Sequence, residues 1–226
     1  MTRTLPFDPK LYLVTDPDLA HERSLLDVVD EAASGGVGLV QLRDKEAEAR
    51  DLLALAIALK ARLAPLNIPL IVNDRVDVAA AAGVGCHIGQ SDLPPEAARM
   101  ILGQNAIIGL SLDQVEQAPA VDPACLDYVA YGPFAPTGTK MGAGKSVGVA
   151  GIERVRALTR LPLVAIGGID VTNAADAIRA GADGVAVVSA IMAARAPKAA
   201  ALALRQSVDR ALGEQSQPEM RRGATG

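Results

Sequence analysis

The sequence predicts a (β/α)8 TIM barrel, a single domain in which eight parallel strands alternate with helices. Short apolar runs rich in β-branched residues alternate with Ala- and Leu-rich stretches along the 226-residue chain, as repeated βα units require. Half of the residues are hydrophobic but only 2% are aromatic, which suits buried parallel strands under Ala-rich helices. An open doubly wound sheet is the alternative arrangement of the same elements.

Each expected strand is a short apolar run that ends in polar residues or glycine. In chain order the strands are "LYLVTD" (11–16), "GLVQLR" (38–43), "PLIVND" (69–74), "CHIG" (86–89), "AIIGLS" (106–111), "DYVAYG" (127–132), "LVAIGG" (163–168) and "GVAVVSA" (184–190). A helix is expected after each strand. In the one after the second strand, a three-four apolar spacing marks a packed face at Leu52, Leu55, Ala56, Leu59 and Leu63. Pro197 suits the first turn of the last helix.

These elements place the barrel at residues 10–212, after a short N-terminal extension, 1–9. The end of the chain, "GEQSQPEMRRGATG" (213–226), is polar and without period, so we expect a disordered tail. The start carries no apolar segment of signal-peptide length, and no run approaches the ~18 apolar residues of a membrane span. We therefore expect a cytoplasmic protein without a membrane partner, and leave a homo-oligomer open.

Charge and cysteine usage exclude several classes of function. The formal charge is −4 without a long basic run, which argues against a nucleic-acid groove. Small phosphorylated molecules remain possible partners, since they need only a few local charges. Cys86 and Cys125 have no CxxC spacing, so neither a disulfide framework nor a zinc site is indicated, and buried thiols are expected.

The segment "GTKMGAGKS" (138–146) imitates the phosphate loop of an ATPase. That motif needs four residues between its first glycine and the Gly-Lys pair, whereas five follow Gly138, and the preceding apolar run ends several residues upstream. We therefore interpret Lys145 as a solvated lysine, and the long loop as functional for another reason.

Polar side chains follow the expected strands, and in a barrel the carboxyl ends of all strands meet at one mouth. Gln41 and Arg43 share one face of the second strand, Lys45 follows, and Ser111 ends the fifth strand. The loop after the sixth strand carries further polar residues, Thr137, Thr139 and Lys140. A surface Arg and Lys capping a strand is the alternative interpretation.

Two carboxylates, Asp74 and Asp92, are expected at the mouths of neighbouring strands without a histidine or thiolate partner. Such a pair suits a hard cation, and Mg²⁺ is the usual one where phosphates are handled. Each Asp alone could instead cap a helix. The metal hypothesis therefore depends on the pair.

Gly167-Gly168 and Val188-Ser189 end the last two strands, the usual phosphate position of such barrels. The glycine pair could alternatively form only a tight turn. No conventional nucleophile with a base is evident, and we interpret His21 and His87 as structural. Two anion sites without a nucleophile fit transfer of an alkyl group away from a metal-bound pyrophosphate.

As a set, the motifs identify a family. "YLVTD", "VQLRDK", "IVNDRVDVA", "HIGQSDL", "IGLS", "YGPFAPTGTK", "VAIGGID" and "AGADGVAVVSAI" occur in this order and spacing, and over about residues 10–212 the chain resembles the thiamine-phosphate synthase (thiamine-phosphate pyrophosphorylase) family. The resemblance implies a (β/α)8 barrel that joins hydroxymethylpyrimidine pyrophosphate to a thiazole phosphate. It further implies a dissociative, Mg²⁺-dependent reaction that releases pyrophosphate and forms thiamine phosphate.

The resemblance also implies roles for individual residues. Those that would bind the pyrimidine pyrophosphate are Gln41, Leu42, Arg43, Asp44, Lys45, Asn73, Ser111 and Lys140, with Lys140, Arg43 and Ser111 as the catalytic ones. Those that would bind the thiazole phosphate are Thr137, Gly138, Thr139, Gly168, Val188 and Ser189. Asp74 and Asp92 would bind Mg²⁺.

One departure and two rival functions accompany this resemblance. The family loop is closer to "GPIFPTPTK", whereas here it reads "GPFAPTGTK", with the aromatic shifted and Gly138 in place of a proline, which puts loop closure in doubt. A thiazole tautomerase of the same superfamily would not require the complete charged set. A non-catalytic sensor of phosphorylated ligands would bind without turnover.

Overall fold

The chain folds into the expected closed barrel. The computed structural model describes residues 7–138 and 145–222, with side chains to residue 215. Its eight strands are all parallel and follow one another around the barrel in chain order, and β8 pairs with β1. They are β1 (Leu11–Val14), β2 (Leu39–Leu42), β3 (Leu70–Asn73), β4 (Gly85–Ile88), β5 (Ile108–Leu112), β6 (Tyr128–Tyr131), β7 (Leu163–Ile166) and β8 (Gly184–Val187).

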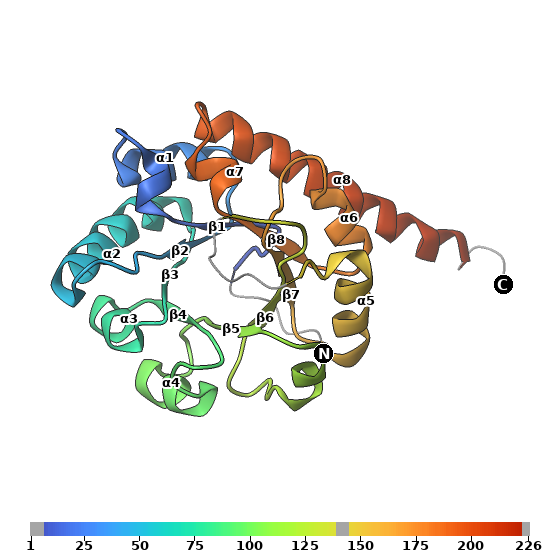
Figure 1. Cartoon of the computed structure of the whole chain (residues 1–226), viewed down its shortest axis with the longest axis horizontal. Coiled ribbons are helices and arrows are strands. Elements are labelled where there is room, and N and C mark those ends of the chain that lie inside the picture. The colour runs from blue at the N-terminus through green and yellow to red at the C-terminus, as the bar shows by residue number, and fades with distance from the viewer. Residues whose placement is uncertain (1–6, 139–144, 223–226) are drawn as a thin grey trace.

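Helices surround the strands as an outer ring (Figure 1). The α-helices are α1 (Leu25–Ser34), α2 (Ala49–Leu63), α3 (Val76–Ala82), α4 (Pro95–Leu102), α5 (Gly148–Leu158), α6 (Ala174–Arg179), α7 (Ser189–Met192) and α8 (Pro197–Arg222). Short 3-10 segments are η1 (Pro17–Ala20), η2 (Ala64–Leu66) and η3 (Val115–Ala120). Pro197 begins α8, and the packed face of α2 is buried as its spacing predicts, except that Leu55 is half-buried.

The strands separate two hydrophobic layers because successive side chains point to opposite faces. The outer layer packs strands against helices and is built almost entirely from Ala, Val, Leu and Ile. The inner layer fills the barrel and contains aromatic residues, with the ring of Phe7 5.5 Å from that of Tyr128. Phe7 therefore closes the end of the barrel opposite the carboxyl ends of the strands.

The structure differs from the sequence-based expectation in two connections. Between β5 and β6 the chain forms only η3, because Pro119 inside this segment cannot continue an α-helical hydrogen-bond ladder. At the other end, α8 continues past Gly213 to Arg222, where a disordered tail was expected. Glu214 pairs with Arg179 at 3.0 Å, and the Gln215 amide donates to the Ile178 carbonyl at 2.7 Å, so polar contacts hold this part of α8 against α6.

Among the residues that the structure describes, no helix combines the length and the apolar character needed to span a membrane.

Candidate active site

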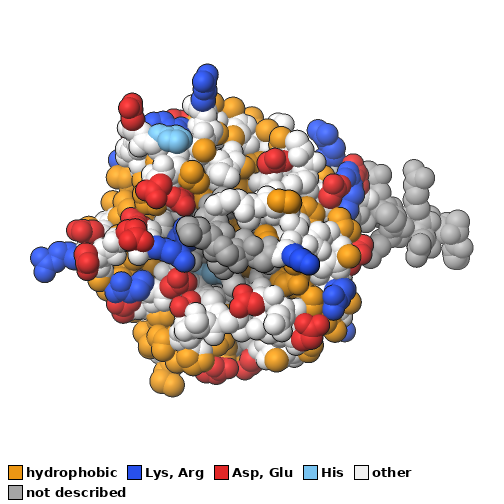
Figure 2. Space-filling view, viewed as in Figure 1, with side chains coloured by type: hydrophobic (Ala, Val, Ile, Leu, Met, Phe, Trp, Pro, Cys, Tyr) orange, Lys and Arg blue, Asp and Glu red, His pale blue; other side chains and the backbone are white. Residues whose placement is uncertain are grey.

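The carboxyl ends of the strands bring most of the predicted residues to one mouth. Gln41 lies near the end of β2, Asn73 ends β3 and Ser111 lies near the end of β5. Gly168 follows β7, and Ser189 begins α7 directly after β8. Figure 2, which views the molecule as in Figure 1, shows basic and acidic side chains on this face around the centre of the barrel.

The loop after β1 holds Arg43 in place. Thr15 is fully buried, accepts a hydrogen bond from the Arg43 N–H at 2.9 Å and donates one to the Arg43 carbonyl at 3.2 Å. The Arg43 guanidinium lies 3.5 Å from the carboxylate of Asp16. Because a guanidinium has five N–H donors, Arg43 keeps donors for an anion while its backbone stays fixed.

The neighbours of Arg43 contribute in different ways. Leu42 is fully buried and packs in the outer hydrophobic layer, so only its backbone can face the mouth. The Asp44 carboxylate accepts hydrogen bonds from the N–H groups of Glu46 and Ala47 at 3.1 and 3.0 Å, which shapes its own loop. Lys45 is exposed, and its charge acts on Asp74.

Asp74 and Asp92 bring two carboxyl groups together beside the ends of β3 and β4. Burial, followed by a hydrogen bond with Asp92 and the charge of Asp92, raises the pKa of Asp74 to about 6, while the charge of Lys45 opposes this rise. The backbone of Asp74 is left-handed, with φ of 62°, and its N–H donates to the His87 carbonyl at 2.8 Å. The protein therefore holds two like charges in contact, and this arrangement favours a proton or a cation between them.

The helix-cap alternative does not describe this carboxyl pair. The Asp92 carboxylate accepts from the Gly89 N–H at 2.6 Å, within the loop that follows β4, and Pro94 occupies the N-cap position of α4. Arg75 occupies the N-cap position of α3.

The donor set fits Mg²⁺, which is often held by one or two carboxylates with substrate phosphates and water as its other ligands. Among the described residues, no group of three or more His, Cys, Asp or Glu side chains forms a closed metal cage. A cation at this pair would take its further ligands from backbone or amide oxygens, substrate phosphates or water.

A continuous row of hydrogen bonds crosses the barrel interior and joins Gln41 to Ser111. The Gln41 amide nitrogen donates to the Tyr12 hydroxyl, which lies 2.9 Å from the Tyr128 hydroxyl. The Tyr128 hydroxyl lies 2.7 Å from Nδ1 of His87, whose Nε2 lies 2.9 Å from Oγ of Ser111. Sequence reasoning did not select the two tyrosines and interpreted His87 as structural, although the two-residue period of strands offers a signal for which side chains point inward.

Ser111 is fixed through its backbone as well. Its carbonyl accepts from the Gln90 amide at 2.6 Å, and Gln90 in turn accepts from the Gln117 amide at 3.0 Å. These contacts tie the loops after β4 and β5 together at the mouth.

The loop after β6 lies on the end of β7. The N–H groups of Phe134 and Ala135 donate to the carbonyls of Ile166 and Gly167 at 2.8 and 3.0 Å. Gly168 has φ of 67°, and a Cβ there would lie 2.5 Å from the Ala135 carbonyl oxygen. The glycine pair thus lets the loop after β6 pack closely against the end of β7. This packing alone requires glycine here, whether or not the pair also binds an anion.

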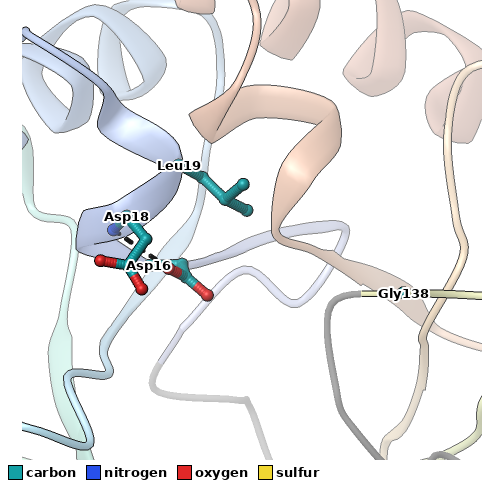
Figure 3. Close-up of a pocket in the computed structure, with 4 residues that line it drawn as sticks. All are labelled: Asp16, Asp18, Leu19 and Gly138. Atoms are coloured by element: carbon teal, nitrogen blue, oxygen red, sulfur yellow. Dashed lines mark hydrogen bonds between the residues drawn. The ribbon is translucent and has the colours of Figure 1, made fainter.

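This loop also faces the residues that follow β1. Gly138 is exposed and lines a hollow of about 330 Å³ together with Asp16, Asp18 and Leu19 (Figure 3). Thr137 is half-buried beside it. Thr139 and Lys140 lie outside the described residues, so their placement stays a prediction. Lys145 is exposed, and α5 begins only at Gly148, as expected if the segment is not an ATPase phosphate loop.

The second expected anion site is formed by backbone and small side chains. Val188 is half-buried and packs against both hydrophobic layers, and Ser189 is exposed at the start of α7. The Gly168 carbonyl accepts from the Asn173 amide at 2.8 Å, which anchors the turn after β7. A short extra helix at this position is a recurrent feature of phosphate sites in such barrels.

Comparisons with known proteins agree with the motifs. The family model described as thiamine monophosphate synthase matches residues 11–191. The chain is 56% identical over 204 residues to the thiamine-phosphate synthase of Xanthobacter autotrophicus, an overlap that covers 90% of this chain and 97% of that protein. It is 51% identical over 205 residues to the thiamine-phosphate synthase of Azorhizobium caulinodans, with the same coverage.

Among solved structures, the thiamine phosphate pyrophosphorylase from Pyrococcus furiosus is similar over the whole barrel. The TM-score is 0.82 at 33% sequence identity, and the match covers 92% of this chain and 98% of that one.

Proposed function

The chain belongs to the thiamine monophosphate synthase family, and from this premise we propose that it transfers the methylene-bearing pyrimidine of hydroxymethylpyrimidine pyrophosphate to the nitrogen of a thiazole phosphate. The enzyme is thus a transferase, and its partners are small phosphorylated molecules. A cytoplasmic location and a homo-oligomeric state stay predictions. The rival functions, a tautomerase and a ligand sensor, are not favoured by the family match.

The pyrimidine pyrophosphate binds at the first of the two anion sites, the one formed by Arg43, Lys45, Lys140 and the pair of Asp74 and Asp92. Arg43 and Lys45 lie at the end of β2, and Lys140 is expected to join them from the loop after β6. Asp74 and Asp92 would hold Mg²⁺, which neutralises charge on a bound pyrophosphate and so makes it a better leaving group. Gln41, Asn73 and Ser111 would contact the pyrimidine ring.

The reaction breaks one bond and forms one bond. The carbon–oxygen bond between the methylene and the pyrophosphate breaks, and its electron pair leaves with the oxygen. The amino group of the pyrimidine stabilises the resulting cation, and the lone pair of the thiazole nitrogen forms the new carbon–nitrogen bond. Arg43, Lys45 and Lys140 stabilise the charge that grows on the leaving group, which is where an enzyme gains rate.

The thiazole phosphate binds at the second anion site. Thr137, Gly138 and Thr139 in the loop after β6, Gly168 after β7, and Val188 with Ser189 after β8 offer hydroxyl and backbone donors without a full positive charge. Holding both substrates in one mouth converts a reaction between two molecules into one within a single complex.

One observation carries the proposal: the paired carboxyl groups of Asp74 and Asp92 lie beside Lys45 at the mouth of the barrel. Burial, together with the hydrogen bond and the charge of Asp92, raises the pKa of Asp74 to about 6. A protein that bound only the thiazole phosphate would have no use for two carboxylates in contact, whereas a metal-bound pyrophosphate gives them one.

The test is incubation of the protein with both substrates and Mg²⁺, with thiamine phosphate and pyrophosphate measured over time. We expect both products to form together and in equal amounts, and neither to form when one substrate is omitted. If the folded protein binds either substrate but yields neither product, the proposal fails. Conversion of a thiazole phosphate tautomer without pyrimidine pyrophosphate would indicate the tautomerase instead.

A further inference from the structure

The interior row of hydrogen bonds from Gln41 to Ser111 has a direction. Gln41 donates to Tyr12, so the single proton of the Tyr12 hydroxyl is available to Tyr128. Tyr128 then accepts from Tyr12 and donates its own proton to Nδ1 of His87. In this direction Nδ1 is the acceptor nitrogen, and Nε2 carries the proton and donates to Ser111.

With the Gln41 nitrogen toward Tyr12, any other direction leaves a buried hydroxyl proton without an acceptor, and the reverse direction requires the Gln41 amide turned over with its oxygen as the acceptor. If Tyr128 donated to Tyr12, the Tyr12 hydroxyl would accept twice and its own proton would have no acceptor along the row. A buried donor without a partner is costly. Within the described part of the chain, every buried side-chain nitrogen and oxygen has a hydrogen-bond partner, which agrees with one continuous direction.

The barrel is built to accommodate this row. Gly109 on β5 lies between His87 on β4 and Tyr128 on β6 in the strand register, and a Cβ at Gly109 would lie 2.0 Å from Cζ of Tyr128. The missing side chain lets the two rings stack over β5, with centroids 5.5 Å apart and planes at 28°. Burial raises the pKa of Tyr12 and of Tyr128, so both hydroxyls keep their protons.

The row ends at the mouth on both sides. Gln41 is 3% exposed and His87 is 6% exposed, whereas Ser111 is only half-buried. Because the Gln41 nitrogen points to Tyr12, its carbonyl oxygen is left as an acceptor. Because Ser111 accepts from His87, its own hydroxyl proton is left to donate outward.

We infer that His87 is a positioning residue, which acts with Tyr128 and Tyr12 to fix Gln41 as an acceptor and Ser111 as a donor toward the bound pyrimidine pyrophosphate. An aminopyrimidine offers N–H donors to the first group, and an anionic leaving group accepts from the second. The direction of the row rests on the orientation of the Gln41 amide, whereas its effect on catalysis rests on the function proposed above.

The tautomer of His87 tests the direction without any substrate. The chain has two histidines, so long-range ¹H–¹⁵N correlation spectra of the protein, with His21→Gln for assignment, give the protonation of each ring nitrogen. We expect His87 to carry its proton on Nε2, and Tyr128→Phe to weaken that preference. A proton on Nδ1, or on both nitrogens, would overturn the inferred direction.

Kinetics test the consequence with a matched pair of variants. Tyr128→Phe removes one hydroxyl from the row and keeps the ring, and Tyr131→Phe makes the same change on the same strand at a buried tyrosine of the outer layer. We expect Tyr128→Phe to lower kcat/KM for the pyrimidine pyrophosphate about tenfold or more. The KM of Tyr128→Phe for the thiazole phosphate should stay within about twofold of that of the unsubstituted protein. For Tyr131→Phe, both this KM and the kcat/KM for the pyrimidine pyrophosphate should stay within about twofold.

Conservative variants of His87 separate positioning from packing. A glutamine can place its amide nitrogen near the position of Nε2 and keep a donor to Ser111, whereas an asparagine reaches only the position of Nδ1. We expect His87→Gln to retain several times the kcat/KM of His87→Asn at similar thermal stability. Equal kinetics for the two variants, or a normal kcat/KM for Tyr128→Phe, would overturn the positioning role. Absence of product from the unsubstituted protein would instead contradict the proposed function and leave the tautomer test intact.

Discussion

The two ends of the barrel use the same residue types in opposite ways. At the amino ends of the strands, Arg99 on α4 donates to Asp127 at 2.8 Å and to three backbone carbonyls at 2.7–3.2 Å, while Asp127 also accepts from the first N–H of β5. Arg156 on α5 and Asp183 repeat this arrangement before β7 and β8. In these two ion pairs at the closed end, each charge lies against an opposite charge and against backbone groups.

At the mouth the charges are left unbalanced. Asp74 lies against Asp92, and the Arg43 guanidinium lies 3.5 Å from Asp16, longer than the 2.8 Å between Arg99 and Asp127. We interpret the paired charges at the closed end as serving stability, and we propose that the like charges and spare donors at the mouth serve ligands.

The largest expected effect is on stability at the closed end. Asp127→Ala leaves the Arg99 guanidinium, with a side chain 6% exposed, buried without its counter-charge. We expect the free energy of unfolding, measured by urea denaturation, to fall by about 3–5 kcal/mol. Below the unfolding transition, kcat should stay within about twofold, and a specific loss of kcat with unchanged stability would contradict the division between the two ends.

Substitution of Thr15, which is buried in the barrel but holds Arg43 at the mouth, should lower both stability and activity. Thr15→Val keeps the shape of a fully buried side chain but removes its two hydrogen bonds to the Arg43 backbone. We expect a loss of about 1–3 kcal/mol in stability and roughly a tenfold loss in kcat/KM for the pyrimidine pyrophosphate. As the control, kcat/KM is measured for each substrate separately. A loss confined to the thiazole phosphate would contradict the assignment of Arg43 to the pyrimidine pyrophosphate.

The second bridge at the closed end should matter less than the first. The Asp183 side chain is 46% exposed, so water can replace part of its interaction with Arg156. We expect Asp183→Ala to lower the free energy of unfolding by only about 1 kcal/mol, measured under the same conditions as Asp127→Ala. A loss as large as that of Asp127→Ala would show that burial does not set the strength of these bridges.

The smallest effect is expected at the lysine of the ATPase-like segment. Lys145 is exposed, and Lys145→Ala should change kcat by less than about twofold in steady-state assays. Lys140→Ala should lower kcat about a hundredfold, because Lys140 is expected to stabilise the leaving group. A larger loss of kcat for Lys145→Ala than for Lys140→Ala would assign the stabilisation of the leaving group to Lys145.

The fold could be predicted from sequence because each strand and helix carries its own signal. The closed barrel is confirmed, and strand ends differ from expectation by a few residues. The η3 connection and the length of α8 could not be predicted from apolar spacing. The first depends on Pro119 within an otherwise suitable stretch, and the second includes polar contacts of Glu214 and Gln215 with α6, which is distant in sequence.

The position of a side chain at the mouth could be predicted where a polar residue lies at a strand end, as at Gln41, Asp74 and Ser111, whose roles stay predictions. A role could not be predicted where it depends on partners from distant strands. In the sequence, Thr15 is indistinguishable from other strand residues, and only its contacts with the Arg43 backbone indicate its role. The interior row depends on Gly109, whose missing side chain lets β4 and β6 meet across β5.

The most direct measurement on the mouth is the initial rate of pyrophosphate release as the Mg²⁺ concentration varies, for the unsubstituted protein and for Asp74→Asn. The unsubstituted protein should show a saturable dependence on Mg²⁺, and Asp74→Asn should be about a hundredfold slower at the Mg²⁺ concentration that saturates the unsubstituted protein. Its free energy of unfolding should differ by less than about 1 kcal/mol, because Asn keeps the shape and removes a like charge. The same rate and the same Mg²⁺ dependence in both proteins would contradict a metal-supported release of pyrophosphate at this pair of carboxylates.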